Sequence, residues 1–126
     1  MIFFTADQHY GNNMIIEYCK RPYKNSSIMD KDLIRKHNSM ITNDDTVFII
    51  GDLTFHKREF AEKILSKLNG QKHLILGNHD SLKPFTYLEI GIISVHTSLE
   101  IFTENGNFIL VHDPAISQID RSKTFL

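Results

Sequence analysis

The sequence has little cysteine, no long apolar run and no excess of charge of either sign. Cys19 is the one cysteine among 126 residues, which excludes an internal disulfide and favours a reducing compartment. A membrane-spanning helix needs about 20 apolar residues, and no run approaches that length. The start, MIFFTADQH, lacks the basic and apolar regions of a signal peptide. We therefore expect a cytoplasmic protein without a membrane partner.

The charge balance also limits the classes of partner. Fourteen basic and fifteen acidic residues give a formal net charge of -1, so no strong global field attracts a long nucleic acid. The hydrophobic content of 41% is that of a globular protein with a substantial core. No repeat or linker divides the chain, which predicts a single domain over residues 1–126. Cys19 is expected to be a small apolar residue on a helix face.

The periodicity predicts strands that alternate with helices. Strands are expected at residues 2–5, 46–50, 73–76 and 108–111, and helices at 14–20, 29–41 and 57–68. This alternation is typical of an α/β fold with parallel strands. Further strands at 92–95 and 99–102 follow one another closely and predict antiparallel sheet in the later half. The ENGN stretch at 104–107 indicates a hairpin turn, because Asn-Gly favours type I′.

Four of the predicted strands end in side chains that can bind a metal. Ligands of open α/β sheets lie beyond the carboxyl ends of the strands, so side chains at these ends can converge. A single such residue is usually part of an ordinary turn, but four independent turns are not expected to choose metal-binding side chains every time. The residues concerned are Asp7, His9, Asp52, Asn78, His79, Asp80, His112 and Asp113.

The side-chain types narrow the chemistry. Carboxylates, imidazoles and a carboxamide without a thiolate suit Mn²⁺ first, with Fe, Zn²⁺ or Ni²⁺ as alternatives. They are too many for one catalytic ion, so we expect two divalent ions that share a carboxylate. Such a pair supports a bridging hydroxide and in-line displacement at phosphorus, which is phosphate ester hydrolysis. His79 is left to protonate the leaving oxygen, with Asp80 orienting its ring.

These motifs resemble the calcineurin-like metallophosphoesterases, whose pattern is D-x-H, G-D, G-N-H-D or G-N-H-E, a lone H and G-H-x-H. The matching stretches are DQH at 7–9, GD at 51–52, GNHD at 77–80 and VHDP around His112. The resemblance covers essentially the whole chain and is strongest to small bacterial and phage-type phosphoesterases. It implies a four-layer α/β/β/α sandwich of two mixed sheets, incomplete at the C-terminus.

The resemblance also implies a role for each matching residue. Asp7 and His9 hold one metal, Asp52 bridges both, and Asn78 and His112 hold the second. His79 is the proton donor, with Asp80 as its partner.

The chain departs from the family pattern in one important respect. No G-H-x-H follows His112, since DPAISQIDRSKTFL contains no histidine. Each ion is then left with three protein ligands, which predicts weaker metal binding and lower activity. We expect a fragment of a longer protein; the alternatives are a naturally short chain and one completed by another subunit. Asn12 stands where relatives of this subgroup often carry His, which puts a substrate contact there in doubt.

Two alternatives to a phosphatase remain open. One is a degenerate module that binds metal or phosphate without turnover, and the other, among enzymes, is a nuclease. The near-neutral charge favours a small molecule or nucleotide as substrate over long nucleic acid. The oligomeric state is not predicted. The remaining candidates are expected to be solvated or ordinary positions without a catalytic role: Arg21, His37, His56, Lys57, Arg58, His73 and His96.

Overall fold

The computed structural model describes residues 1–113 and 124–125. Its main sheet has four parallel strands in the order β1-β2-β3-β4: β1 (Ile2–Thr5), β2 (Thr46–Ile50), β3 (Gln71–Ile75) and β4 (Ile92–His96). A second sheet has the order β5-β6-β7, formed by β5 (Leu99–Thr103), β6 (Gly106–Leu110) and β7 (Thr124–Phe125). The α/β class is confirmed. The expectation of two mixed sheets holds only for the second, where β5 and β6 are antiparallel and β6 and β7 parallel.

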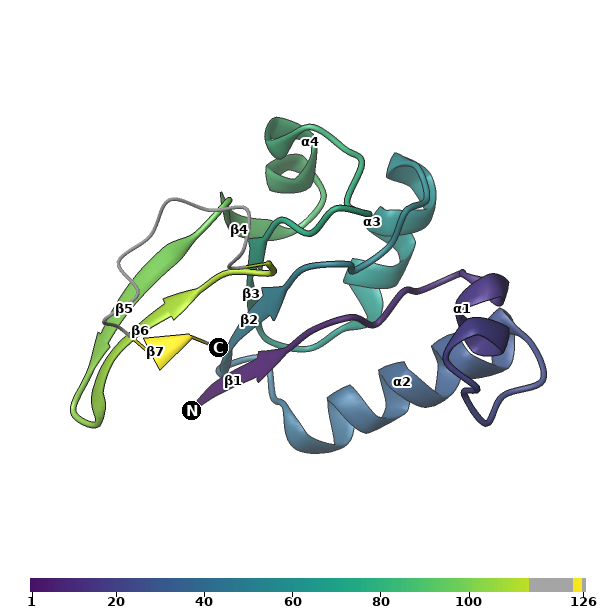
Figure 1. Ribbon diagram of the computed structural model, residues 1–126, viewed down its shortest axis with the longest axis horizontal. Coiled ribbons are helices and arrows are strands. Elements are labelled where there is room, and N and C mark those ends of the chain that lie inside the picture. Colours follow the sequence, from purple (N-terminus) through teal and green to yellow (C-terminus); the bar gives the residue numbers. More distant parts are fainter. Residues whose placement is uncertain (114–123, 126) are drawn as a thin grey trace.

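Helices and the second sheet cover opposite faces of the parallel sheet (Figure 1). The described helices are α1 (Asn13–Tyr18), α2 (Ser26–Met40), α3 (Arg58–Lys67) and α4 (Pro84–Glu89). On the helical face, Ile64 and Leu65 of α3 share a core with Val47 and Leu74 of the sheet. On the other face, Leu110 of β6 belongs to a second core.

The apolar run of β2 is explained by burial on both faces. Val47 and Ile49 belong to the helical core, whereas Phe48 and Ile50 belong to the core against the second sheet. A strand covered on both sides has no solvent face, so its sequence does not alternate with polar residues. This continuous run is why the bounds of β2 were predicted correctly.

The start of α2 was predicted three residues too late. Asn25 is the residue that caps this helix, because its side chain accepts a hydrogen bond from the N–H of Ile28 at 3.0 Å. Asp30, the fifth residue of the helix, is buried. The six-residue α4 was not predicted, although Pro84 at its first turn is a common helix start.

The assignment of residues 92–95 to antiparallel sheet was wrong. β4 pairs in parallel with β3, with Ile75 opposite His96, because α4 supplies the crossover between the two strands. The hairpin between β5 and β6 is confirmed, but Thr103 pairs with Gly106. Gly106 therefore belongs to β6, with a φ of 128°, and Asn-Gly is not the central pair of the turn.

Two further expectations were tested by the fold. Cys19 is exposed at the C-terminal cap of α1, so it is not packed on a helix face as expected. Within residues 1–113 and 124–125, no helix combines the length and apolar character required to cross a membrane.

Candidate metal centre

The loops that follow β1 and β2 run side by side beyond the ends of the strands. The N–H of Asp7 donates to the carbonyl of Gly51 at 3.0 Å, and the N–H of His9 donates to the carbonyl of Asp52 at 3.0 Å. These bonds extend the pairing of the two strands into their loops. They place the D-x-H and G-D motifs next to each other, as the strand-end argument predicted.

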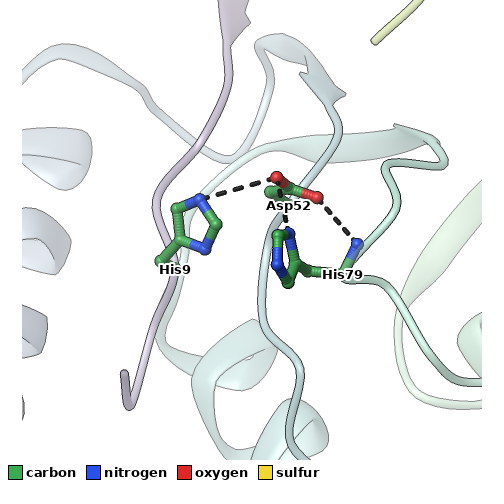
Figure 2. A group of neighbouring side chains, drawn as sticks. All are labelled: His9, Asp52 and His79. Carbon is green, nitrogen blue, oxygen red and sulfur yellow. Dashed lines mark hydrogen bonds and ion pairs between the residues drawn. The ribbon is translucent and has the colours of Figure 1, made fainter. Parts of the chain in front are cut away.

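Asp52 is the point on which the imidazole side chains converge. Its Oδ2 lies 3.5 Å from Nε2 of His9, 3.1 Å from Nδ1 of His79 and 3.2 Å from Nε2 of His112. Figure 2 shows the His9 and His79 side chains both directed toward the carboxylate. The Asp52 side chain is only 6% exposed. One buried carboxylate oxygen thus has three nitrogen neighbours from three separate segments.

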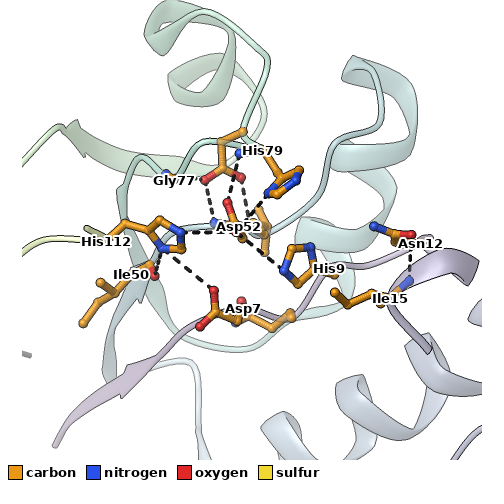
Figure 3. A network of polar contacts seen from close by, with 12 residues as sticks. Asp7, His9, Asn12, Ile15, Ile50, Asp52, Gly77, His79 and His112 are labelled. Carbon is orange, nitrogen blue, oxygen red and sulfur yellow. Dashed lines mark hydrogen bonds and ion pairs between the residues drawn. The ribbon is translucent and has the colours of Figure 1, made fainter. Parts of the chain in front are cut away.

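His112 reaches this carboxylate from the second sheet, just after β6 (Figure 3). Its Nδ1 lies 3.2 Å from the carbonyl oxygen of Ile50 and 3.8 Å from Oδ1 of Asp7. A carbonyl only accepts, so Nδ1 must carry the hydrogen in this bond. In a neutral ring, Nε2 then presents a lone pair to the Asp52 carboxylate at 3.2 Å. Two acceptors at that separation need a proton or a metal ion between them.

The donor atoms fit divalent metal ions. Two groups have ligand atoms that all lie within 4.8 Å of one another: Asp7, Asp52 and His112, and His9, Asp52 and His79. Ligands about 2.1 Å from one ion, at right or tetrahedral angles, are roughly 3.0–3.4 Å apart. The distances from Asp52 to the imidazole nitrogens are close to that range. Asp52 belongs to both groups.

The grouping differs from the one that the resemblance implied. Asp7 groups with His112 rather than with His9, and His9 groups with His79. Asn78 is exposed, and its side chain makes no hydrogen bond with the described part of the chain. Its role as a ligand stays a prediction.

His79 is the most accessible of the three imidazoles, with 49% of its side chain exposed. Its backbone N–H donates to Oδ1 of Asp52 at 3.0 Å, and its ring meets the ring of His9 edge to face at 5.3 Å between centroids. Because Nδ1 faces Asp52, the other ring nitrogen remains for solvent or substrate.

Asp80 has a different set of partners from the one expected. Its carboxylate accepts hydrogen bonds from the backbone N–H groups of Asp52 at 2.9 Å, Leu53 at 2.9 Å and Gly77 at 2.8 Å. Among the described residues these three amides are its hydrogen-bond partners, and no contact with the His79 ring occurs, so its role in orienting that ring stays a prediction. Burial raises the pKa of Asp80, and the three N–H groups oppose that rise. Asp80 fixes the loop after β3 to the loop after β2.

Three of the predicted ligands have a backbone conformation that residues other than glycine seldom adopt. The φ angles are 57° at Asp7, 54° at His9 and 55° at Asp52. This left-handed conformation costs roughly 1–2 kcal/mol per residue. Such strain persists only where surrounding contacts hold the backbone, and it is concentrated at functional sites.

Arg21 supplies part of that restraint. Its guanidinium donates to the carbonyl of Gln8 at 2.9 Å and to the carbonyl of Asp7 at 2.7 Å. The prediction of a solvated charge at this position is therefore wrong. No local sequence signal could identify these contacts, because Arg21 lies 13 positions after Gln8 and 14 positions after Asp7 in the sequence.

Two glycines allow the close approach of the loops. A Cβ atom at Gly51 would collide with the ring of His112, and one at Gly77 would collide with the carboxylate of Asp52. The glycines of the GD and GNHD motifs therefore make room for the neighbouring ligands. Gly77 does not have a left-handed backbone, so a glycine is needed there only because a Cβ atom has no room.

The protonation states suit metal binding. Burial by itself would raise the pKa of Asp52, but hydrogen bonds from His79 and the nearby imidazoles outweigh it, and the pKa is lowered. Burial lowers the pKa of His9, although the Asp52 carboxylate opposes this. At neutral pH Asp52 is therefore ionised and His9 is neutral, and these are the forms that bind a metal.

Two residues near the centre have structural roles that the sequence analysis missed. His56, expected to be solvated, is half-buried; its Nε2 lies 2.8 Å from the carbonyl of Gly11, and its ring packs against Phe60 at 4.5 Å. Asn12 caps α1, because its side chain accepts from the N–H groups of Met14 at 3.0 Å and Ile15 at 3.2 Å (Figure 3). The preference of Asn for helix caps could have identified the second role.

The other residues set aside in the sequence analysis lie away from Asp52. His37 contacts the carbonyl of Asn69 at 2.8 Å, and His73 and His96 both contact Ser94. Arg58 forms an ion pair with Glu89 at 3.4 Å, and Lys57 is exposed at the start of α3. Asp113 lies beyond the end of β6 and is exposed. Among the residues described, none of these belongs to either ligand group.

Comparison with known proteins gives relatives of similar sequence. The chain is 33% identical over 117 residues to the uncharacterized protein MJ1445 of Methanocaldococcus jannaschii, a match that covers 90% of this chain and 58% of that protein. It is 33% identical over 85 residues to the gene 66 protein of Mycobacterium phage L5, which covers 65% and 41%. The chain thus spans about half the length of these relatives. No protein-family model matches it.

A solved structure shares the fold. The protein of unknown function AQ665 from Aquifex aeolicus superposes with a TM-score of 0.75 over 95% of this chain and 64% of that one, at 24% sequence identity. The arrangement of strands and helices described above is therefore one that an experimentally determined protein adopts.

Proposed function

We propose that this chain is a metallophosphoesterase domain of the calcineurin-like type, which hydrolyses a phosphate mono- or diester with two divalent metal ions, Mn²⁺ being the first choice. One observation carries the proposal: two groups of ligand atoms share the buried carboxylate of Asp52. Two-metal hydrolysis at phosphorus uses ions roughly 3.5–4 Å apart, and a carboxylate shared between two sites can hold ions that close together.

The residues of the chain have separate tasks in this proposal. Asp7, His9, Asp52, Asn78 and His112 hold the ions, with Asp52 between them. When bound, the ions supply Lewis acidity toward the phosphoryl oxygens and lower the pKa of the attacking water. Although Nδ1 of His79 lies in the group with His9 and Asp52, we assign this residue to proton donation rather than to metal binding, because its side chain is 49% exposed and its other ring nitrogen does not face Asp52. Asp80 positions the loops rather than taking part in the proton transfer.

The four-layer α/β/β/α sandwich belongs to the same proposal. A helical layer and two sheets lie in the described residues, which supports a layered sandwich of this kind. The substrate is proposed to be a small phosphate ester or a nucleotide, in keeping with the formal net charge of -1.

Hydrolysis of p-nitrophenyl phosphate and bis(p-nitrophenyl) phosphate tests the proposal. Turnover is expected with added Mn²⁺ and is expected to disappear with chelator. The assay should use this chain and the gene product read beyond Leu126. Absence of metal-dependent turnover in both would contradict the proposal.

Two variants of an active form test the role of His79. His79→Ala should lower turnover much more than metal content, whereas Asp52→Ala should lower both. Equal losses of turnover and metal content in His79→Ala would rule out the proton-donor role.

A second candidate is a module that binds metal or phosphate without turnover. The observation that favours it is the small ligand set, since each group in the described residues offers only three side chains. Stoichiometric Mn²⁺ binding in calorimetry without hydrolysis by the longer product would establish this alternative. Cleavage of oligonucleotides in preference to the small esters would instead indicate a nuclease.

A further inference from the structure

A cleft of about 430 Å³ lies between α2 and α3, beside the candidate metal centre. Gly11 and His56 form part of its wall. Gly11 lies two residues after His9, and His56 lies four residues after Asp52. The cleft therefore opens next to the loops that carry the predicted ligands. Figure 1 shows the two helices on the same side of the parallel sheet.

The positive charges of the two helices are divided between the cleft and the outer surface. Three of the six lysine and arginine residues of α2 and α3 have carboxylate partners: Arg35 and Lys36 with Asp32 at 2.7 and 3.0 Å, and Arg58 with Glu89 at 3.4 Å. None of these three lines the cleft.

The other three cations line the cleft, and no carboxylate of the described residues forms an ion pair with them. They are Lys31 of α2 and Lys63 and Lys67 of α3, and all three are exposed. The cations of α2 and α3 that form ion pairs thus lie outside the cleft, and those that form none line it.

The carboxylates of the same helices offset this charge only in part, through the interaction of Asp30 with Lys67. Only Asp30 lines the cleft, whereas Asp32, Glu59 and Glu62 do not. The Asp30 side chain is buried and accepts a hydrogen bond from the N–H of Gly11 at 2.9 Å. One carboxylate against three lysines leaves the cleft with an excess of positive charge, which favours an anionic ligand.

We propose that this cleft binds the second anionic group of a substrate that carries two or more phosphates, with Lys31, Lys63 and Lys67 contacting that group. The proposal rests on the proposed function, because it takes the ester to be cleaved to lie at Asp52. A phosphate is the ligand of choice, since its oxygens accept several charge-assisted hydrogen bonds at once. The lysine side chains are long and can adapt to it as point charges.

Binding of inorganic pyrophosphate to metal-free protein tests the cleft separately from the metal centre. The protein is treated with chelator and dialysed, and binding is measured by calorimetry. The double variant Lys63→Gln, Lys67→Gln is expected to bind pyrophosphate at least about tenfold more weakly, because it loses charge-assisted contacts. Arg35→Gln, Lys36→Gln is the matched control: it removes the same charge from outside the cleft and should change the affinity less than about twofold.

Two results would overturn the proposal: wild-type protein that does not bind pyrophosphate at millimolar concentration, or equal losses in the two double variants. Thermal unfolding of both variants checks that they fold.

A kinetic comparison connects the cleft with the substrate. With Mn²⁺, the cleft variant should raise KM for an activated ester that carries a second phosphate and leave KM for p-nitrophenyl phosphate unchanged. An equal rise for both esters would contradict the assignment of the cleft to the second phosphate. Selective pyrophosphate binding without any hydrolysis would instead overturn the proposed function and leave the anion site established.

Discussion

The two ends of the parallel sheet each have an aspartate with several polar contacts, but within residues 1–113 and 124–125 the candidate metal-binding groups lie at one end only. At the amino end, Asp45 accepts from the amino terminus of Met1 at 2.9 Å and from the N–H of Thr42 at 2.8 Å. At the carboxyl end, Asp52 faces three imidazole nitrogens. Asp45 accepts hydrogen bonds from a backbone N–H group and the chain terminus, which is ordinary for an aspartate in a turn. Three imidazole nitrogens around Asp52 are not needed to form a turn.

The backbone differs between the two ends in the same way. At the amino end the left-handed conformation occurs at Gly70, with φ 104°, where it is tolerated without a Cβ. At the carboxyl end it occurs at Asp7, His9 and Asp52. The carboxyl end therefore stores strain that the amino end avoids. We infer that the strain is retained there because these three side chains must point at a shared site.

The largest expected effect is on metal binding. Asp52→Asn should lower Mn²⁺ affinity by at least about 100-fold, because changes even in the residues that support metal ligands cost 10–100-fold. Asp45→Asn, the same change at the other end of the sheet, should leave Mn²⁺ affinity unchanged. Calorimetric titration measures both. Similar losses in the two variants would remove the distinction between the ends.

The next effect is steric and concerns the close approach of the loops. Gly77→Ala should lower the free energy of unfolding by about 1–3 kcal/mol, as expected for overpacking, because its Cβ would collide with Asp52. In Gly106→Ala the added Cβ meets no atom within 4 Å, so the free energy of unfolding should fall only through the backbone strain of a φ of 128°. Urea unfolding compares the two variants. A larger loss at Gly106 would show that the loops at Asp52 can relax.

A similar or smaller loss of stability is expected when Asp80 is changed. Asp80→Asn should lower the free energy of unfolding by about 1–2 kcal/mol, because its amide group cannot accept all three backbone N–H groups. Mn²⁺ affinity should fall less than in Asp52→Asn, since Asp80 acts on the ligands through the backbone. Urea unfolding and calorimetry measure the two quantities. Unchanged stability would contradict the role of Asp80 in joining the loops.

The smallest effect is a pH dependence at the amino end. Burial lowers the pKa of His37 below its ordinary 6.5, although the bond to the Asn69 carbonyl opposes this. Below pH 6.5 the unfolded chain takes up a proton that the folded protein resists, so stability falls as the pH is lowered. His37→Gln should reduce the slope between pH 7 and 5.5 in urea unfolding. An unchanged slope would place the proton uptake at other histidines.

Local sequence was enough to predict the elements that end at the metal centre. The apolar run of 46–50 and the motifs DQH, GD and GNHD could be read directly, because strand ends and glycine turns depend on nearby residues. The capping role of Asn25 and the helix that begins at Pro84 also have local signals.

Tertiary structure alone decided how the motifs work together. The contacts of Arg21 with the Asp7 loop, of Asp80 with the amides beside Asp52, and of His112 with Ile50 join segments distant in the sequence. No local pattern specifies such contacts, because they depend on which strands lie side by side. The sequence by itself determined that Asp7, His9, Asp52, His79 and His112 stand at strand ends. The packing of the loops after β1, β2, β3 and β6 decided that their side chains meet at a single buried carboxylate.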